Sequence, residues 1–307
     1  MSALRDLAVM LIFPTGLFLI LLGLAYEWLN RKLVARLQNR VGPRWFQPLA
    51  DTLKLLAKET IVPDHVDARL FVALPAVALA GGLTAALYIP MAGFAPAASF
   101  PGDLIVAVYL LSLLSVCTAL AGSNTMDRYS LVGATRTLTQ LFSYEAPFLL
   151  ALLGPAMVAG SWQISAIIAA GHGQWLVLSQ PIGFLVALIG LMGKLEMPPF
   201  DSPEAETEIV SGALTEYGGR GLALFRLARN VELVVGLALI AALYLGGAAG
   251  PVAFFAETIA LLAIITLLRV LFTRFRIDQM AWLWWRGGAL LALAQLLAVI
   301  VWKGIMA

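Results

Sequence analysis

The feature that most restricts the fold of this chain is a succession of long apolar stretches. A helix needs about 20 apolar residues to cross the hydrocarbon core of a bilayer. Eight stretches meet that requirement, at about residues 5–28, 70–91, 103–121, 135–159, 176–194, 222–246, 251–272 and 286–303. Because a helix satisfies its own backbone hydrogen bonds inside lipid, we predict an all-α, polytopic integral membrane protein. The whole chain, residues 1–307, is expected to form a single transmembrane domain.

Composition supports this class of protein. The chain is 61% hydrophobic and 12% charged, whereas about a quarter of the residues in a soluble protein are charged. The first apolar stretch is too long for a signal peptide and lacks a small-residue cleavage site, so we expect it to be retained as a helix. No internal repeat is visible in the sequence, which argues against a transporter built from two related halves.

Lysine and arginine are distributed unevenly among the predicted connections between helices. They gather in long connections at about residues 29–69, 122–134, 195–221 and 273–285. They do not occur in the connections at about 92–102, 160–175 and 247–250. Basic loops stay on the cytoplasmic side of a membrane. We therefore predict long cytoplasmic loops, both termini outside, and a location in the cytoplasmic (inner) membrane of a bacterium or archaeon; Arg5 and Lys303 are the exceptions to the pattern.

Few residues in the sequence could hold a redox centre. Cys117 is the single cysteine, and it lies in an apolar stretch where a small packing residue is expected. His65 and His172, the two histidines, lie in separate loops. Iron–sulfur and nickel–iron centres need several thiolates, and no glycine-rich phosphate loop follows a strand. We therefore expect no catalytic residue, cofactor or metal in this chain, and no nucleic acid partner.

The first long loop contains a short amphipathic segment. Gly42-Pro43 predicts a turn, and apolar residues then recur at helical spacing, at Phe46, Leu49, Leu53 and Leu56. One interpretation is a helix that lies on the lipid headgroups. The other is a docking surface for a soluble partner, and the two interpretations are compatible.

One short segment is unusually acidic. Six of the eighteen carboxylates fall between residues 196 and 216, with no lysine or arginine among them, at Glu196, Asp201, Glu204, Glu206, Glu208 and Glu216. Ser202-Pro203 could start a helix whose first turn suits Glu204 and Glu206. That interpretation leaves the other acids unexplained. Carboxylates crowded in a poorly solvated place raise one another's pKa, so that some hold protons near neutral pH, as a proton relay requires.

Ionisable residues also interrupt the apolar stretches. Glu145 lies inside the predicted fourth helix, Lys194 closes the fifth, and Arg229 and Glu232 lie in the sixth. Such residues are costly in a membrane and usually functional. The structural alternative for Glu145 is a buried ion pair with an arginine such as Arg136, and we favour the functional interpretation.

Several segments together resemble one family. They are RKLVARLQNRVGP, QPLADTLKLLAKETIVP, FSYEAP, PPFDSPEAETEIVSGALTEYGGRGLALF and RFRIDQMAWLWW. The chain resembles subunit 1, also called the H subunit, of respiratory complex I and its relatives in membrane-bound nickel–iron hydrogenases, including formate hydrogenlyase. Complex I members usually carry an Asn-Arg pair before Pro-Phe-Asp and an acid near the position of Lys194, where this chain reads KLEMPPFD. These departures look more like the hydrogenase-type branch.

The resemblance implies a membrane anchor and coupling subunit, which links a soluble redox arm to proton or sodium translocation. The implied partners are a hydrogenase-like large subunit, an iron–sulfur small subunit and antiporter-like membrane subunits, and the nickel–iron and iron–sulfur centres would lie in those partners. The implied coupling path consists of Glu145, Lys194, Asp201, Glu204, Glu206 and Glu208. The implied docking residues are Arg36, Arg40, Asp51, Lys54, Glu216, Tyr217, Arg220, Arg274, Arg276 and Asp278.

Three other functions stay open from the sequence. The first is the quinone-site H subunit of a NADH-quinone oxidoreductase (complex I), with quinone as the bound molecule. The second is a stand-alone ion transporter, and the third is a purely structural anchor whose acids only hold the redox arm. The coupling hypothesis predicts that Glu204→Gln or Glu208→Gln abolishes coupling while the complex still assembles.

Overall fold

The computed structural model describes residues 10–171 and 175–306, so that Arg5, His172 and the start of the first predicted helix lie outside it. Within the described ranges the chain is helical and contains no β-strand. The predicted all-α class is therefore confirmed.

The helices are joined by connections of very different length, from residues 125–127 between two long helices to residues 86–102. In chain order they are α2 (Gly16–Leu37), α3 (Gln47–Ala57), α4 (Ala68–Ala85), α5 (Asp103–Asn124), α6 (Arg128–Ala159), α7 (Ile164–Ala170), α8 (Leu176–Ser179), α9 (Pro181–Lys194), α10 (Glu206–Ile209), the 3₁₀ helix η1 (Gly212–Leu214), α11 (Gly219–Tyr244), α12 (Pro251–Leu271), α13 (Ile277–Trp282), the π-helix η2 (Leu283–Gly288) and α14 (Ala289–Met306).

Six helical segments of the described chain are long and apolar enough to cross a membrane: α4, α5, α6, α11, α12 and the continuous segment Ile277–Lys303. The shorter α9 is also apolar. Helix α2 has the length to cross, but its second half carries Glu27, Arg31, Lys32 and Arg36. The chain is therefore a multi-pass membrane protein, and the number of eight spans stays a prediction.

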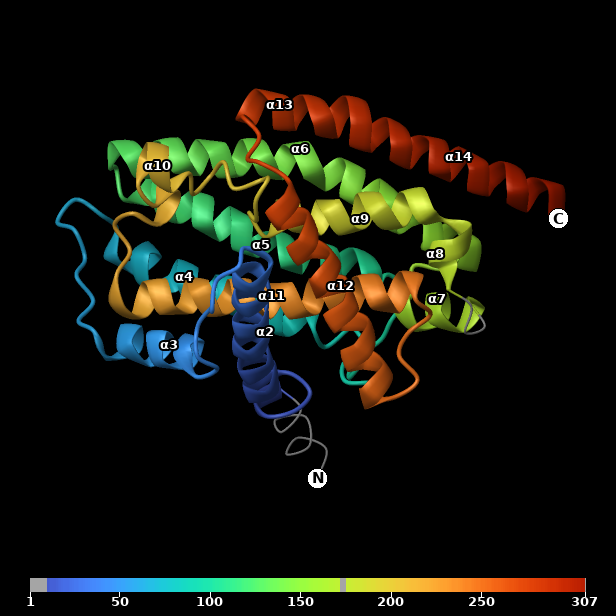
Figure 1. The fold of residues 1–307 in the computed structure, drawn as a ribbon, viewed down its shortest axis with the longest axis horizontal. Helices are drawn as coiled ribbons and strands as arrows, with labels where there is room; N and C mark the ends of the chain where they lie inside the picture. Colours follow the sequence, from blue (N-terminus) through green and yellow to red (C-terminus); the bar gives the residue numbers. More distant parts are fainter. Residues whose placement is uncertain (1–9, 172–174, 307) are drawn as a thin grey trace.

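Helix α11 forms the centre of the bundle. It is buried along almost its whole length, and its second half, after Glu232, is apolar on every side, as expected for a helix in the interior of a bundle. It contacts α2, α4 and α12, and α2 and α12 cross in front of it in Figure 1. Helices α6 and α14 lie along one edge, and α14 leads to the C terminus at the end away from α10 (Figure 1).

Several helices extend beyond the apolar stretches that predict them. Helix α2 ends at Leu37, inside the loop predicted at about 29–69. Helix α6 begins at Arg128, so only residues 125–127 remain of the connection predicted at about 122–134. Asp127 explains this early start, because its carboxylate accepts hydrogen bonds from the Tyr129 and Ser130 amides. In the same way, α13 begins at Ile277, within the loop predicted at about 273–285.

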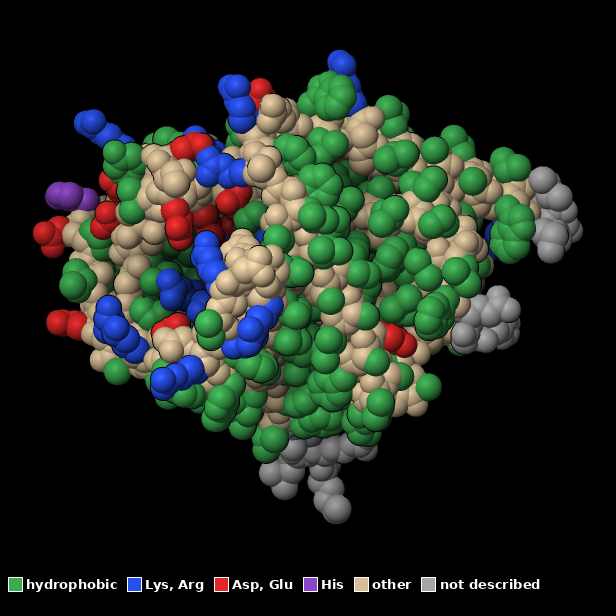
Figure 2. Space-filling view, in the orientation of Figure 1, with side chains coloured by type: hydrophobic (Ala, Val, Ile, Leu, Met, Phe, Trp, Pro, Cys, Tyr) green, Lys and Arg blue, Asp and Glu red, His purple; other side chains and the backbone are tan. Residues whose placement is uncertain are grey.

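The charged side chains are concentrated in one part of the surface. Figure 2 shows most of the blue and red side chains in the half of the molecule that contains α3 and α10, while the other half of that face is mainly hydrophobic. Such segregation is expected when one part of the surface faces lipid and another faces water.

The amphipathic segment of the first loop forms α3, as predicted. Its buried residues are Pro48 and Thr52, whereas the apolar side chains of Leu49 and Leu53 are exposed. Both interpretations of this helix require an exposed apolar face, since either lipid headgroups or a partner protein would cover it.

Candidate functional site

The acidic segment connects α9 to α11 and is folded into the protein. Ser202-Pro203 does not start a helix, so that prediction is wrong; the short α10 begins at Glu206 instead. The cause is the backbone between them, because Ala205 has a positive φ of 26° that a regular helix cannot contain. Phe200 and Ile209 are buried and hold the segment against the bundle.

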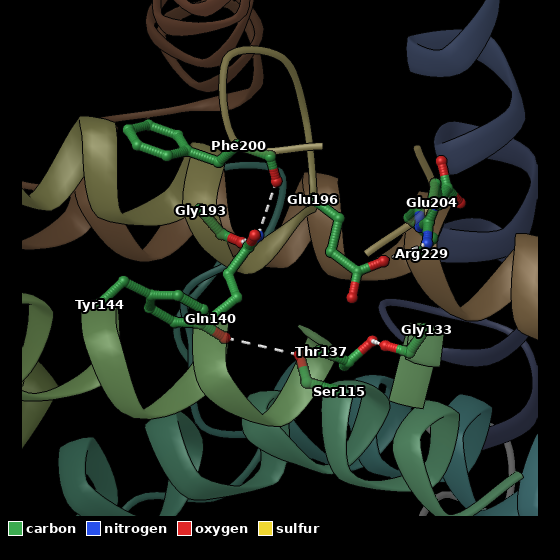
Figure 3. Close-up of polar contacts among 10 residues, drawn as sticks. All are labelled: Ser115, Gly133, Thr137, Gln140, Tyr144, Gly193, Glu196, Phe200, Glu204 and Arg229. Atoms are coloured by element: carbon green, nitrogen blue, oxygen red, sulfur yellow. Dashed lines mark hydrogen bonds and ion pairs between the residues drawn. The ribbon is translucent and has the colours of Figure 1, made fainter. Parts of the chain in front are cut away.

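Gln140 of α6 fastens the start of this segment. Its side-chain amide donates hydrogen bonds of 2.7 Å to the carbonyl oxygens of Gly193 and Phe200 (Figure 3). One amide group therefore joins the end of α9 to the loop that follows. This contact limits the positions that Glu196, between those two carbonyls in sequence, can adopt.

Arg229 of α11 neutralises two acids of the segment. Its guanidinium pairs with Glu196 at 2.8 Å and also with Glu204 (Figure 3). The acidic segment contains no basic residue of its own, so the compensating charge comes from a helix more than twenty residues away in sequence. A carboxylate–guanidinium–carboxylate cluster is thus formed at the charged end of the bundle.

Glu208 has a different environment. It pairs with Arg136 of α6 at 2.7 Å and with Arg274 in the connection before α13. Arg136 therefore does not pair with Glu145, which corrects the structural alternative derived from the sequence. The contacts of Glu208 therefore join α6 to the connection before α13 at the surface.

A second polar group lies between α5, α6 and α9. Lys194 Nζ donates to Ser112 Oγ at 2.9 Å, and the Ser112 hydroxyl donates to Glu145 Oε1 at 2.6 Å. The Lys194 side chain is buried, and its ammonium lies 5.6 Å from the ring centre of Tyr144 and 5.9 Å from that of Phe148. The rings contribute a cation–π attraction, so the lysine is held without leaving the apolar interior.

Glu232 of α11 connects the two groups electrostatically. Its charge acts on Lys194, Arg229 and Glu196. Neither of its carboxylate oxygens has a hydrogen-bond partner among the described residues, although both are buried. A buried carboxylate without partners is costly, and a proton or a water molecule would relieve that cost. Glu232 therefore lies within electrostatic range of both clusters without forming a hydrogen bond to either in the described structure.

Two open cavities lead to the Arg229 cluster. Their volumes are about 430 and 300 Å³, and both are lined by Glu27, Arg31, Glu204, Glu206, Arg229 and Asn230. The larger one continues to Glu196, Asp201, Arg269 and Arg274. Asn230 donates to Glu27 at 2.5 Å and helps to form the shared wall. The acids of the cluster are thus reachable from the charged surface.

The pKa values of two loop carboxyls are displaced upward. Burial raises the pKa of Glu196 from 4.5 to about 7, Arg229 opposes the rise, and the nearby charge of Glu204 adds to it. Burial also raises the pKa of Asp201. A carboxyl with a pKa near 7 changes its protonation state in the range in which proton transfer at neutral pH needs it.

We expect Glu196 to titrate with a midpoint of about pH 7. Its protonated C=O band in the infrared spectrum should fade as the pH rises through that value, and Glu196→Gln should remove the band. Because its pKa in the folded chain lies above 4.5, the folded chain binds more protons than the unfolded chain between about pH 4.5 and 7. The free energy of unfolding should therefore fall as the pH rises through this window.

Arg229→Gln provides the test of the cause, because it removes the charge that opposes the shift and should move the midpoint above 7. Glu206→Gln is the control, since Glu206 is exposed and lines the same cavities. A midpoint near 4.5 in the unmodified chain would contradict the prediction.

The structure places the predicted residues in three kinds of environment. Glu204 joins the Arg229 cluster, and Glu145 and Lys194 form the interior group with Ser112. Glu208 pairs with Arg136 and Arg274 at the surface. The docking residues that are exposed are Arg36, Arg40, Lys54, Glu216, Arg220, Arg276 and Asp278. Asp51 and Arg274 are partly buried.

Tyr217 is not at the surface. It is 4% exposed, and its ring stacks on Phe71 with 4.1 Å between ring centres. Burial raises the pKa of its hydroxyl. Because the side chain is buried, Tyr217 could contribute to docking only by holding the neighbouring loop in position.

Sequence reasoning did not assign roles to Ser112, Gln140, Glu27 and Asn230, which complete the two groups. Their only signal is a polar side chain within or beside an apolar stretch. Serine and glutamine are common enough in membrane helices that this signal does not select them. In the described ranges, no group of three or more His, Cys, Asp or Glu side chains could hold a metal ion.

The fold and these ionisable groups define a multi-pass membrane protein with one charged cluster at an end of the bundle and a second polar group in its interior. The sequence profile of the NADH dehydrogenase family matches residues 8–300. The chain belongs to this family, in its subunit 1 branch, as the resemblance predicted.

Curated relatives agree with this assignment. The chain is 36% identical to the H subunit of NADH-quinone oxidoreductase from Carboxydothermus hydrogenoformans, over 92% of this chain and 85% of that protein. It is 37% identical to the protein of the same name from Thermomicrobium roseum, over 90% of each. Among solved structures, it resembles a chain of the membrane-bound sulfane sulfur reductase, an archaeal respiratory membrane complex, with a TM-score of 0.86 over 97% of this chain and 99% of that chain. At 24% identity, this last likeness concerns the fold alone.

Proposed function

We propose that this chain is the membrane subunit, of the subunit 1 type, of a complex I-like oxidoreductase that reduces quinone. In this role it holds the soluble redox arm at its charged end and relays protons between that end and the membrane interior. The names of its curated relatives favour this function over the hydrogenase-type function that the sequence departures suggested.

The observation that carries the proposal is the series of ionisable groups from Glu204 to Glu145. Glu204 and Glu196 share Arg229, Glu232 acts on both Arg229 and Lys194, and Lys194 reaches Glu145 through Ser112. Buried charges of this kind are expensive unless they are paired. A purely structural anchor would not need such a series to continue into the apolar interior.

The larger cavity has suitable chemistry for a quinone headgroup. Its volume of about 430 Å³ lies in the range of small-molecule sites. Leu195, Met197 and Leu233 supply apolar wall. Arg269 also lines it, and forms no hydrogen bond or ion pair within the described part of the chain. Its guanidinium could therefore donate to a quinone carbonyl, while the neighbouring arginines are held by acids.

Purification of the intact complex in mild detergent tests the proposed function. We expect the chain to co-purify with a soluble arm that oxidises NADH, and the complex to transfer electrons from NADH to an added short-chain quinone. Hydrogen production by a nickel–iron partner without quinone reduction would contradict the proposal and favour the hydrogenase-type function. Ion flux by the chain alone, reconstituted in vesicles, would instead indicate a transporter.

The hydrogenase-type anchor is the second candidate. The observation that favours it is Lys194, because the complex I relatives that the chain resembles usually carry an acid near this position. The structure places its ammonium in the centre of the interior group. The same purification separates the two candidates through the identity of the catalytic partner and the electron acceptor.

A further inference from the structure

A polar pocket lies at the end of the bundle that is remote from the acidic segment. It has a volume of about 270 Å³ and is bounded by the last turn of α6, the α8–α9 junction and the C-terminal part of α14. In Figure 1 this is the end at which α8 and the C terminus lie. Its polar lining comes from Ser179, Gln180 and Gln295, and Trp302 forms part of the wall. None of the groups of the candidate site takes part in it.

Gln295 is the feature of this pocket that calls for a ligand. It lines the pocket, its side chain is 7% exposed, and its amide makes no hydrogen bond with another described residue. Buried amide groups are rarely left in this state, because the lost hydrogen bonds with water are not replaced. Gln180 also lacks hydrogen-bond partners in the described ranges, but both polar atoms of its side chain are enclosed by protein, and its oxygen packs against Gly154 of α6.

A positive charge lies at the rim of the pocket. Lys303 Nζ donates to the Met157 carbonyl oxygen at 2.9 Å, and the Val158 carbonyl oxygen, from a residue that lines the pocket, is 3.5 Å away. The lysine is exposed, so its remaining N–H groups are free to bind a ligand from outside. The predicted connections at this end contain no other lysine or arginine between residues 160 and 175.

The pocket lies where a membrane surface would be. Exposed tryptophans mark this end of the bundle, at Trp162, Trp175 and Trp302. Tryptophan is enriched at the boundary between hydrocarbon and headgroups. Beside the pocket, Leu178, Leu297 and Val301 expose apolar side chains. A ligand with a polar head and hydrocarbon tails could therefore place its head in the pocket and its tails along α9 and α14.

We propose that this pocket binds the headgroup of an anionic phospholipid that carries hydroxyl groups, of the phosphatidylglycerol class. The phosphate accepts hydrogen bonds from Lys303 and from the amide nitrogen of Gln295. A headgroup hydroxyl donates to the amide oxygen of Gln295, which a choline headgroup could not do. Lipid is favoured over water alone because the pocket opens between apolar, exposed faces and holds a cation at its rim.

Native mass spectrometry of the full chain tests this proposal. The chain is purified in a mild detergent and titrated with phosphatidylglycerol or, separately, with phosphatidylcholine of the same acyl chains. We expect one phosphatidylglycerol to be retained per chain, with clearly weaker retention of phosphatidylcholine. Lys303→Gln should weaken retention roughly tenfold, as for the loss of a charge-assisted hydrogen bond. Gln295→Glu should weaken it further, because it places an acid against the phosphate.

Two variants serve as controls. Lys303→Arg keeps the charge and should keep the lipid. Gln163→Glu adds the same charge as Gln295→Glu at the same end of the bundle but outside the pocket, and it should leave retention unchanged. Lys303 is exposed, so the test does not depend on whether a change at the buried Gln295 folds. Equal retention of the two lipids, unchanged retention in Lys303→Gln, or a neighbouring protein seated in the pocket of the assembled complex would overturn the proposal.

Discussion

Lys194→Met should abolish proton translocation in the assembled complex. The interior group consists of Lys194, Ser112 and Glu145, and Lys194 is its only basic member in the described structure. Its ammonium donates a hydrogen bond to Ser112 and is attracted by the charges of Glu145 and Glu232. Without the ammonium, proton transfer between Glu232 and Glu145 loses the positive charge and the hydrogen-bond donor that lie between the two acids. A positioned proton-transfer group contributes roughly 100- to 10,000-fold, so we expect a loss of about 100-fold or more, measured with a pH-sensitive dye in sealed vesicles.

The same change should lower stability. Removing one partner of a buried charge pair costs about 3–5 kcal/mol, because the remaining charge is left uncompensated. The double variant Lys194→Met with Glu232→Gln removes both charges, so its thermal unfolding temperature in detergent should return toward that of the unmodified chain. Proton translocation should not return with it, because the relay stays interrupted.

Lys54→Met is the matched control, since Lys54 is an exposed lysine on α3 and has no place in the interior group. Translocation by Lys194→Met at the unmodified stoichiometry would exclude Lys194 from the path. Recovery of translocation in the double variant would show that Lys194 only offsets the charge of Glu232.

The order of helices is predictable from this sequence, because each apolar stretch is separated from the next by polar residues. The ends of the helices are less predictable. Asp127 starts α6 at Arg128 through two side-chain hydrogen bonds, well before the apolar part of that helix. Hydropathy does not register such a cap, and so it overestimates the length of the connection.

The candidate site is predictable in its residue types but not in its pairs. The acidic segment, Glu145 and Lys194 are conspicuous because charge is rare in an apolar chain. The partner of Glu204 and Glu196, however, is Arg229, and the partner of Glu208 is Arg136. These pairs depend on how α6 and α11 pack against the loop. Sequence spacing carries no record of that packing, which is why it suggests an Arg136–Glu145 pair instead.

These pairs separate two acids that look alike in the sequence. Glu204 faces both cavities and shares Arg229 with the buried Glu196. Glu208 lines neither cavity and holds Arg136 and Arg274 at the surface. The first acid is therefore suited to proton exchange, and the second is suited to fixing the position of the loop.

Glu204→Gln should consequently abolish proton translocation and leave the complex assembled, because glutamine keeps a hydrogen-bond acceptor for Arg229 but cannot carry a proton. Glu208→Gln should have the opposite profile. It weakens two surface ion pairs that fix the position of the loop, each worth about 0–1 kcal/mol. We therefore expect the soluble arm to be held less tightly. The complexes that stay assembled should still move the same number of protons per substrate oxidised as the unmodified complex.

The two effects are measured together, as arm retention after purification in increasing salt and as protons moved per substrate oxidised. Salt should release the arm earlier in Glu208→Gln, since exposed ion pairs are screened, and should not distinguish Glu204→Gln from the unmodified complex. Equal loss of translocation in both variants would show that Glu204 and Glu208 belong to the same proton path, as the sequence alone suggests. Loss of the arm in both variants would instead make the acidic segment a structural anchor, because neither carboxylate would then be needed for anything but attachment.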